Sequence, residues 1–165
     1  MSGFFGVVGK QDCLADLFYG TDYHSHLGTR RGGMAVHGSD GFSRHIHDIS
    51  NAQFRSKFST EVSHMAGRKG IGVISDYEDQ PLIVGSHLGT YAVVTVGIVT
   101  NLAALIERAY RDRIAHFSHM NDGDVNPTEL VAALINQGSS FAEGIRIAQE
   151  AIEGSCSLLL LTADS

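Results

Sequence analysis

The residue best placed to do chemistry is Ser2, which follows Met1 and precedes the short apolar stretch Phe4–Val8. Because serine is small, we expect Met1 to be removed, which leaves a hydroxyl and a free α-amino group on one residue. An N-terminal nucleophile enzyme uses this pairing, since the side chain attacks and the amine accepts its proton directly or through water. The alternative is a first strand that follows a serine, and on this stretch alone the alternative is the simpler interpretation.

The nine histidines offer a different chemistry, metal binding. Three pairs are closely spaced: His24 with His26, His45 with His47, and His116 with His119. His45 and His47 alternate along a predicted strand and therefore share a face. Zinc requires three or four convergent ligands, and no pair has a third ligand at a recognised spacing. We therefore expect no metal and no cofactor, with solvated or hydrogen-bonded histidines; a zinc site is the alternative.

Other reactive side chains have simpler interpretations. Arg30 and Arg31 lie in a glycine-rich segment and are interpreted as solvated loop cations, with phosphate or partner contacts as the alternative. Cys13 and Cys156 are interpreted as small core residues rather than nucleophiles. The acidic turn at residues 76–79 lacks the loop geometry of a calcium site.

Composition limits the classes of function. The chain has 165 residues, 43% of them hydrophobic, enough for one domain with a sizeable core. Its net charge of −6 and lack of a basic run argue against nucleic acid and anionic membranes as partners. The longest apolar run, Leu158–Leu161, is too short to span a bilayer, and no stretch is typical of a secretory leader. Two cysteines are too few for a disulfide framework, so a cytoplasmic protein is expected.

Periodicity and turn residues predict a layered α+β fold rather than a doubly wound sheet, because hairpins outnumber βαβ units. Predicted strands cover residues 4–8, 34–36, 41–49, 70–75, 81–84, 91–99 and 157–162, and predicted helices begin near residues 11, 51, 102, 127 and 141. Ser39-Asp40 predicts a hairpin turn, and Ser50 or Asn51, Asn101, Asn126 and Ser140 are predicted helix caps. Residues 1–165 are expected to form one domain. Because the last strand is apolar and ends three residues before the chain does, we expect a C-terminally truncated domain with more sequence beyond it.

Six short motifs occur in an order found in a known family. They are Met1-Ser2-Gly3-Phe4-Phe5-Gly6, the segment Leu27–Ala35 with Arg31-Gly32, Gln80-Pro81-Leu82, the segment Val96–Asn101 with Val96-Gly97, Thr128-Glu129, and Gly154–Leu158. Together they resemble the glutaminase domain of class II glutamine amidotransferases, most closely that of the amidophosphoribosyltransferases. The resemblance covers essentially the whole chain. It implies a four-layer αββα sandwich of the N-terminal nucleophile hydrolase type.

The resemblance also implies a function. Such enzymes hydrolyse glutamine and pass ammonia to phosphoribosyl pyrophosphate at a second, phosphoribosyltransferase domain, a glycosyltransferase reaction that opens purine biosynthesis. That domain would follow this chain and be its partner, and homo-oligomers would be expected.

Four positions depart from the family pattern where its chemistry is done. Ser2 occupies the place of the nucleophilic cysteine, and Ser75 occupies that of the arginine that binds the glutamine α-carboxylate, with Asp76 beside it. Val96 replaces the oxyanion-hole asparagine before Gly97, a change that typically costs about two to three orders of magnitude in rate. Pro127 replaces the acid that holds the α-amino group.

These departures predict a degenerate domain without glutaminase activity, which has a structural or regulatory role. Two alternatives stay open. One is an active hydrolase in which Ser2 attacks an amide other than that of glutamine, and the other is a pure interaction module.

Overall fold

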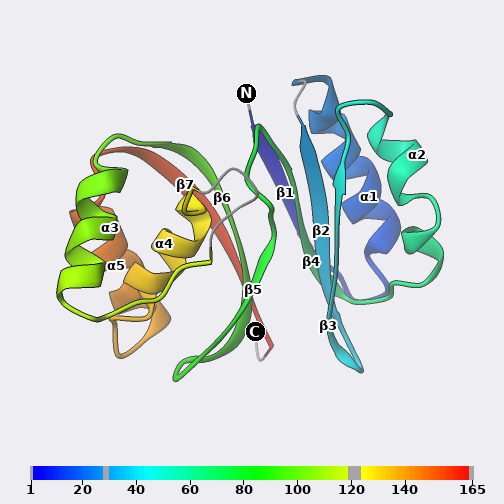
Figure 1. Ribbon diagram of the computed structural model, residues 1–165. Helices are drawn as coiled ribbons and strands as arrows, with labels where there is room; N and C mark the ends of the chain where they lie inside the picture. Colours follow the sequence, from blue (N-terminus) through cyan, green and yellow to red (C-terminus); the bar gives the residue numbers. More distant parts are fainter. Residues whose placement is uncertain (1, 28–29, 119–123, 164–165) are drawn as a thin grey trace.

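Two antiparallel sheets lie face to face in the computed structural model, and helices cover the outer side of each (Figure 1). The structure describes residues 2–27, 30–118 and 124–163. The first sheet has the strand order β1-β4-β2-β3, and the second has the order β5-β6-β7. Their bounds are β1 Gly3–Val8, β2 Arg31–Gly38, β3 Gly41–Asp48, β4 Lys69–Ser75, β5 Leu82–Ser86, β6 Gly89–Val99 and β7 Gly154–Thr162.

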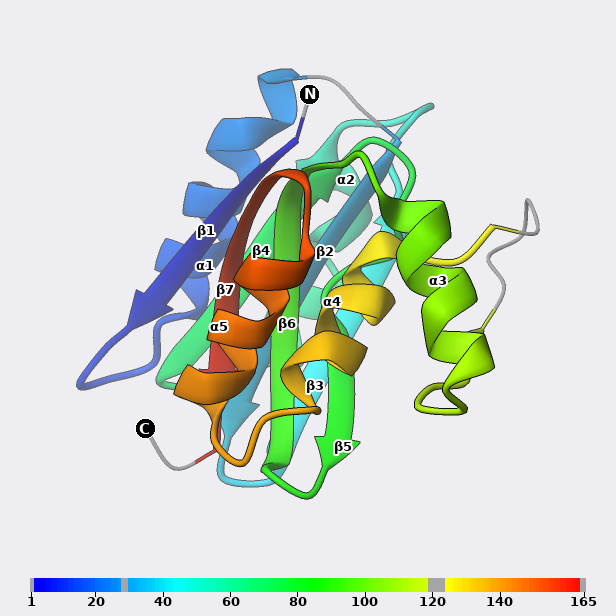
Figure 2. The same cartoon turned by 90° about the vertical axis from the view of Figure 1, so that its left-hand side faces the viewer.

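The helices divide between the two outer layers. On the first sheet lie α1 (Leu14–Tyr23), α2 (Phe54–Phe58) and the 3₁₀ turns η1 (His24–Leu27) and η2 (Glu61–Ser63). On the second lie α3 (Leu102–Arg111), α4 (Pro127–Ile135) and α5 (Phe141–Ala151), seen in front of their sheet in Figure 2. No helix among the described residues is long and apolar enough to cross a membrane.

Apolar side chains fill the three spaces between the four layers. Alternation along each strand sends one set of side chains to the facing sheet and the other to the helices. The inner core comprises Ala35, Ile71, Val73, Ala92, Val94 and Leu161. One outer core joins α1 and α2 to the first sheet, and another joins α3, α4 and α5 to the second. The predicted αββα sandwich is therefore confirmed.

Two of the predicted caps form as expected. The Asn126 side chain accepts a hydrogen bond from Thr128 N at 2.9 Å, and Pro127 begins α4. Ser140 accepts from Glu143 N at 3.2 Å at the start of α5. Asn101 precedes α3, but its side chain bonds Ala151 O and Glu153 N instead, so it ties α3 to the end of α5.

Two expectations about local structure were wrong. The helix predicted from residue 51 to Gly67 is broken into α2 and η2, and Gln53, not Ser50 or Asn51, precedes α2. The hydroxyls of Ser59 and Ser63 bond the carbonyls of Ser56 and Thr60, a local pairing that competes with a continuous helix.

The second correction concerns residues 31–33, which belong to β2 rather than to a loop. Gly33 allows this because the segment Gln80-Pro81 crosses it there: a Cβ on Gly33 would lie 1.7 Å from the carbonyl oxygen of Gln80. The side chain of Gln80 also bonds β6 of the second sheet: it accepts a hydrogen bond from Thr95 N at 2.7 Å and donates one to Thr95 O at 3.0 Å. The crossing therefore joins the two sheets.

Candidate functional site

A cavity of about 170 Å³ brings together four of the predicted site residues. Ser2, Val96, Gly97 and Pro127 all line it, although they come from the chain start, β6 and the first turn of α4. The acidic turn after β4 closes one side, and β7 contributes Cys156.

The hydroxyl of Ser2 donates to a carboxylate, Asp76 Oδ2, at 3.5 Å. Glu78 lines the same cavity, so two acids lie close to the nucleophile position. None of the described residues that line the cavity is an arginine, lysine or histidine. Apart from the amino terminus of the chain, the charged groups at the site are therefore carboxylates.

Burial perturbs the titration of this turn. Desolvation raises the pKa of Glu78, and the neighbouring Asp76 raises it further, against backbone hydrogen bonds and the positive charge of the chain's amino terminus, which lower it. Desolvation also raises the pKa of Tyr77, with Glu78 and other acids adding to the shift. Shifts of this kind indicate carboxylates crowded into a partly buried place.

On the β6 side the cavity is lined by Val96, where the resemblance implies a hydrogen-bond donor for the oxyanion. Val96 presents only methyl groups. Only glycine fits at position 97, because β7 passes so closely that a Cβ on Gly97 would lie 2.0 Å from the carbonyl oxygen of Ser155. The next amide, Ile98 N, donates to Ser155 Oγ at 3.3 Å.

The α4 side of the cavity is held by buried polar contacts. Asn126, which caps the helix, also donates to the carbonyl of Asp79 at 3.0 Å. The Thr128 and Thr95 hydroxyls are 2.6 Å apart and join α4 to β6. Pro127 is therefore fixed between the acidic turn and the sheet, and it offers no charge and no N–H to a ligand.

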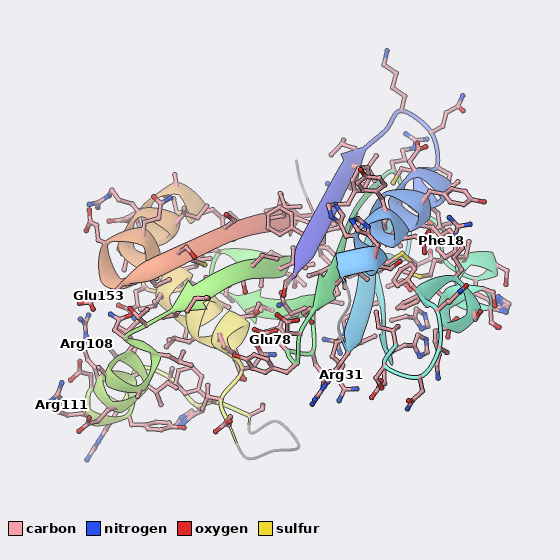
Figure 3. The ribbon with its side chains drawn as sticks, turned by 90° about the horizontal axis from the view of Figure 1, so that it is seen from above. Phe18, Arg31, Glu78, Arg108, Arg111 and Glu153 are labelled. Carbon is pink, nitrogen blue, oxygen red and sulfur yellow. The ribbon has the colours of Figure 1, made fainter. Side chains whose placement is uncertain are left out.

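The other three predicted positions lie outside the cavity lining. Ser75 is buried, and its hydroxyl donates to Glu78 O at 2.5 Å, which closes the acidic turn. Gly32 packs against the ring of Phe54 in α2. Arg31 lies at the start of β2, an inner strand of the first sheet, and Figure 3 shows Glu78 between the two sheets.

Arg31 is not a solvated loop cation, so that expectation was wrong. Its guanidinium donates to Asp48 Oδ2 at 2.8 Å, and its Nε lies 3.1 Å from Asp79 Oδ1. Both partners are held by the fold, because Asp48 ends β3 and Asp79 belongs to the acidic turn. The Arg31 guanidinium is thus already paired with two carboxylates, those of Asp48 and Asp79. Arg30 is exposed, as expected.

The cysteines differ from each other. Cys13 is buried in the core as predicted, at 2% exposure. Cys156 lines the cavity, and burial raises the pKa of its thiol. A raised pKa keeps the thiol protonated near neutral pH, which argues against its action as a nucleophile.

One histidine pair acquires a third polar neighbour that spacing could not reveal. His45 and His47 meet Glu61, which lies 14 residues beyond His47 in η2. Burial raises the pKa of Glu61, but backbone and His47 hydrogen bonds lower it more, so the net shift is downward. His26 contacts Tyr23 O through its ring nitrogen, and His119 lies outside the described residues.

Comparison with known proteins depends on shape rather than sequence. No model of a known protein family matches the chain, and no curated protein sequence matches it. Two solved structures are similar over 99% of this chain. One is glutamine phosphoribosylpyrophosphate (PRPP) amidotransferase from B. subtilis complexed with ADP and GMP, with a TM-score of 0.79 and 20% identity. The other is an allosteric regulatory enzyme of purine biosynthesis, with a TM-score of 0.82 and 19% identity.

The chain spans about a third of the length of these proteins, covering 35% and 36% of their chains. Both matches include the two facing sheets and their outer helices, since nearly all of this chain is covered. The chain therefore has the same fold as the matched third of these two proteins.

Proposed function

We propose that this chain is the amidotransferase-type domain of an amidophosphoribosyltransferase-like protein, and that it has lost glutamine hydrolysis. The observation that carries the proposal is the lining of the Ser2 cavity. The nucleophile position contacts the carboxylate of Asp76, and the described lining residues include no cationic side chain.

Glutamine brings an α-carboxylate that such a cavity does not accommodate. A carboxylate is normally bound by a cation through charge-assisted hydrogen bonds. Here Asp76 and Glu78 would lie near it instead, and Arg31 is already paired with Asp48 and Asp79. Binding would place like charges together in a partly buried site, where they repel most strongly.

The same cavity gives little help to the chemical step. A hydroxyl is a weaker nucleophile than a thiolate unless a base activates it. Val96 offers no donor for the developing oxyanion, and the loss of one such donor typically costs about 10²–10³ in rate. Pro127 has no charge for the substrate's α-amino group. Each change weakens a different part of the reaction.

The intact fold suggests what the domain still does. The two outer cores and the sheet-to-sheet contacts of Gln80 are complete, so the domain can support a neighbouring domain without catalysing a reaction itself. We propose a structural or regulatory role beside a phosphoribosyltransferase domain in purine biosynthesis. The parent enzyme would then use free ammonia.

The test compares the chain with two variants at Ser2. Wild-type protein, Ser2→Ala and Ser2→Cys are incubated with glutamine, and glutamate release is measured. We expect release at the enzyme-free rate in all three, because Ser2→Cys restores the thiol but neither the carboxylate-binding cation nor the oxyanion donor. Glutamate release by the wild type that Ser2→Ala abolishes would overturn the proposal.

A second experiment addresses the parent protein. The longer protein is supplied with phosphoribosyl pyrophosphate and either an ammonium salt or glutamine, and pyrophosphate release is followed. Turnover with the ammonium salt alone is expected. Equal turnover with glutamine would mean that the domain still delivers ammonia.

One observation favours a second candidate, hydrolysis of an amide that lacks a carboxylate. Asp76 lies within hydrogen-bonding distance of the Ser2 hydroxyl and could accept its proton. An active serine should react with a fluorophosphonate probe and gain its mass at Ser2, and Asp76→Asn should slow that reaction. Absence of labelling removes this candidate.

A further inference from the structure

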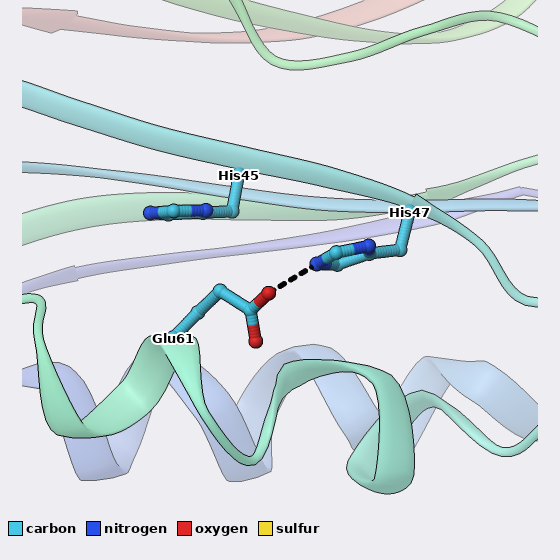
Figure 4. A group of neighbouring side chains, drawn as sticks. All are labelled: His45, His47 and Glu61. Carbon is cyan, nitrogen blue, oxygen red and sulfur yellow. Dashed lines mark hydrogen bonds and ion pairs between the residues drawn. The ribbon is translucent and has the colours of Figure 1, made fainter.

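A second polar site lies on the opposite side of the first sheet from the Ser2 cavity. His45 and His47 project from the same face of β3, toward the segment that carries Glu61. Figure 4 shows the two imidazole rings side by side along the strand and the carboxylate of Glu61 reaching up to them. One ligand atom from each of the three residues lies within 4.8 Å of the other two.

Only one of the two carboxylate oxygens of Glu61 has a hydrogen-bond partner among the described residues. Glu61 Oε1 lies 2.7 Å from His47 Nε2. Glu61 Oε2 is buried and has no hydrogen-bond partner among the described residues. Buried polar atoms are nearly always paired, so an orphaned carboxylate oxygen beside two imidazoles calls for an explanation, such as a bound ion.

We propose that His45, His47 and Glu61 bind a divalent first-row transition metal, with Zn²⁺ as the ion whose preferences they fit best. Imidazole nitrogen and carboxylate oxygen are both zinc ligands, and two histidines with one glutamate form a known set of three. Water would take the fourth position.

The geometry requires only small side-chain movement. A tetrahedral zinc ion with bonds of about 2.0–2.1 Å holds its ligand atoms about 3.4 Å apart. The three ligand atoms lie within 4.8 Å of one another, so no pair must approach by more than about 1.4 Å. His47 Nε2 and Glu61 Oε1, now 2.7 Å apart, must instead separate slightly. His47 and Glu61 are 31% and 16% exposed, which leaves room for rotation and a path for the ion.

The surrounding fold already orients the ligands. The His47 ring packs edge-on against Phe58 of α2, with centroids 4.7 Å apart. β3 is an edge strand of its sheet, and the residues between it and η2 form the broken α2 segment. An ion held by both would therefore fasten this segment to the sheet edge. The site shares no residue with the Ser2 cavity, so it is independent of the proposed function.

The test measures metal binding by the folded chain. Metal-free protein is titrated with ZnCl₂ in a calorimeter, and with Co²⁺ while the visible absorption spectrum is recorded. Three variants are compared with the wild type: His45→Ala, Glu61→Gln and, as the matched control, His64→Ala. His64 is an exposed histidine next to η2 that the proposed site does not use.

We expect one equivalent of Zn²⁺ to bind the wild type and His64→Ala with the same affinity, and the Co²⁺ spectrum to show a four-coordinate site. His45→Ala and Glu61→Gln should each weaken binding by at least about tenfold, since even partners outside the ligand shell typically matter that much. Zn²⁺ should also raise the Tm of the wild type but not of Glu61→Gln.

Three results would overturn the proposal. One is no saturable Zn²⁺ binding by the wild type, and another is equal binding by all four proteins. The third is loss of binding in His64→Ala alone. Glu61→Gln keeps the shape of the side chain, so it separates loss of a ligand from loss of folding.

Discussion

At the scale of single residues, Glu78 shows how an acid can lower the stability of the fold that holds it. Its carboxyl is partly buried beside Asp76, and burial raises its pKa above the ordinary value of 4.5. The folded state therefore holds the proton more tightly than the unfolded state does. The resulting stability is complete below about pH 4.5 and is lost as pH rises through the folded pKa.

Glu78→Gln removes this penalty while keeping an oxygen acceptor. At pH 7 the variant should have a higher free energy of unfolding than the wild type, and the difference should shrink as pH falls toward 4. Urea unfolding at a series of pH values measures both. A variant less stable than the wild type at pH 7 would show that the ionised carboxylate has a favourable partner.

Sequence reasoning reached part of the site at this scale. The resemblance assigned seven positions to one pocket. In the structure Ser2, Val96, Gly97 and Pro127 line one cavity, and Arg31, Gly32 and Ser75 do not, so the pocket's role stays a prediction. Sequence reasoning could not reveal that Glu61 meets His45 and His47, because that contact depends on where α2 breaks. Nor could it reveal that Arg31 pairs with Asp79, since the acidic turn reaches it only through the crossing of residues 76–81.

At the scale of elements, the start of α4 also fastens the helix to the acidic turn, through Asn126. Asn126 is 5% exposed, caps the helix and also bonds the carbonyl of Asp79, whereas Ser140 caps α5 at an exposed position. The two caps therefore make a matched pair that differs in burial and in the second hydrogen bond.

Ser140→Ala should lower the free energy of unfolding by about 1 kcal/mol, the usual value for a lost cap. Asn126→Ala should cost about 2 kcal/mol, because a second buried bond worth about 1 kcal/mol is lost as well. Chemical denaturation of both variants provides the comparison. Equal losses would mean that the bond to Asp79 contributes nothing.

Tyr91 links β6 to the same helix. Its ring is fully buried, and its hydroxyl donates to Asn136 Oδ1 at 3.0 Å. Burial raises the pKa of Tyr91 to about 12 from 10. Between these values the folded state keeps a proton that the unfolded state releases, so stability falls as pH rises.

Tyr91→Phe should cost about 1 kcal/mol at pH 7 through the lost hydrogen bond. Above pH 10 the wild type should lose stability from this residue and the variant should not, so their free energies of unfolding should converge. Thermal unfolding at pH 7, 10 and 11 measures the gap. A gap that stays constant would contradict the raised pKa.

The elements themselves were largely predictable. The caps at Asn126 and Ser140 and the short apolar runs of β4 and β6 are local signals, which a sequence displays directly. The broken segment after β3 was not, because its apolar spacing is helical while its serine hydroxyls bond nearby carbonyls. The apolar spacing favours one continuous helix and the serine hydrogen bonds favour a break, and the structure has the break.

At the scale of the whole molecule, the inner core makes the two halves one unit. Leu161 is 6% exposed and packs between the sheets with Ala92 and Val73. Leu161→Ala should cost about 2–5 kcal/mol. Because both sheets share this core, the free energy of opening measured by amide hydrogen exchange should fall by the same amount in β2 and in β6. Loss confined to the second sheet would show that the halves unfold separately.

The pairing of β1 has a consequence for synthesis on the ribosome. Its antiparallel partner is β4, and residues 9–68 separate the two strands. At about 5–20 residues per second, the growing chain needs about 3–12 s to make that interval. For those seconds Phe4, Phe5 and their neighbours lack the strand with which they pair. The nascent chain must carry an unsatisfied edge until its fourth strand is translated.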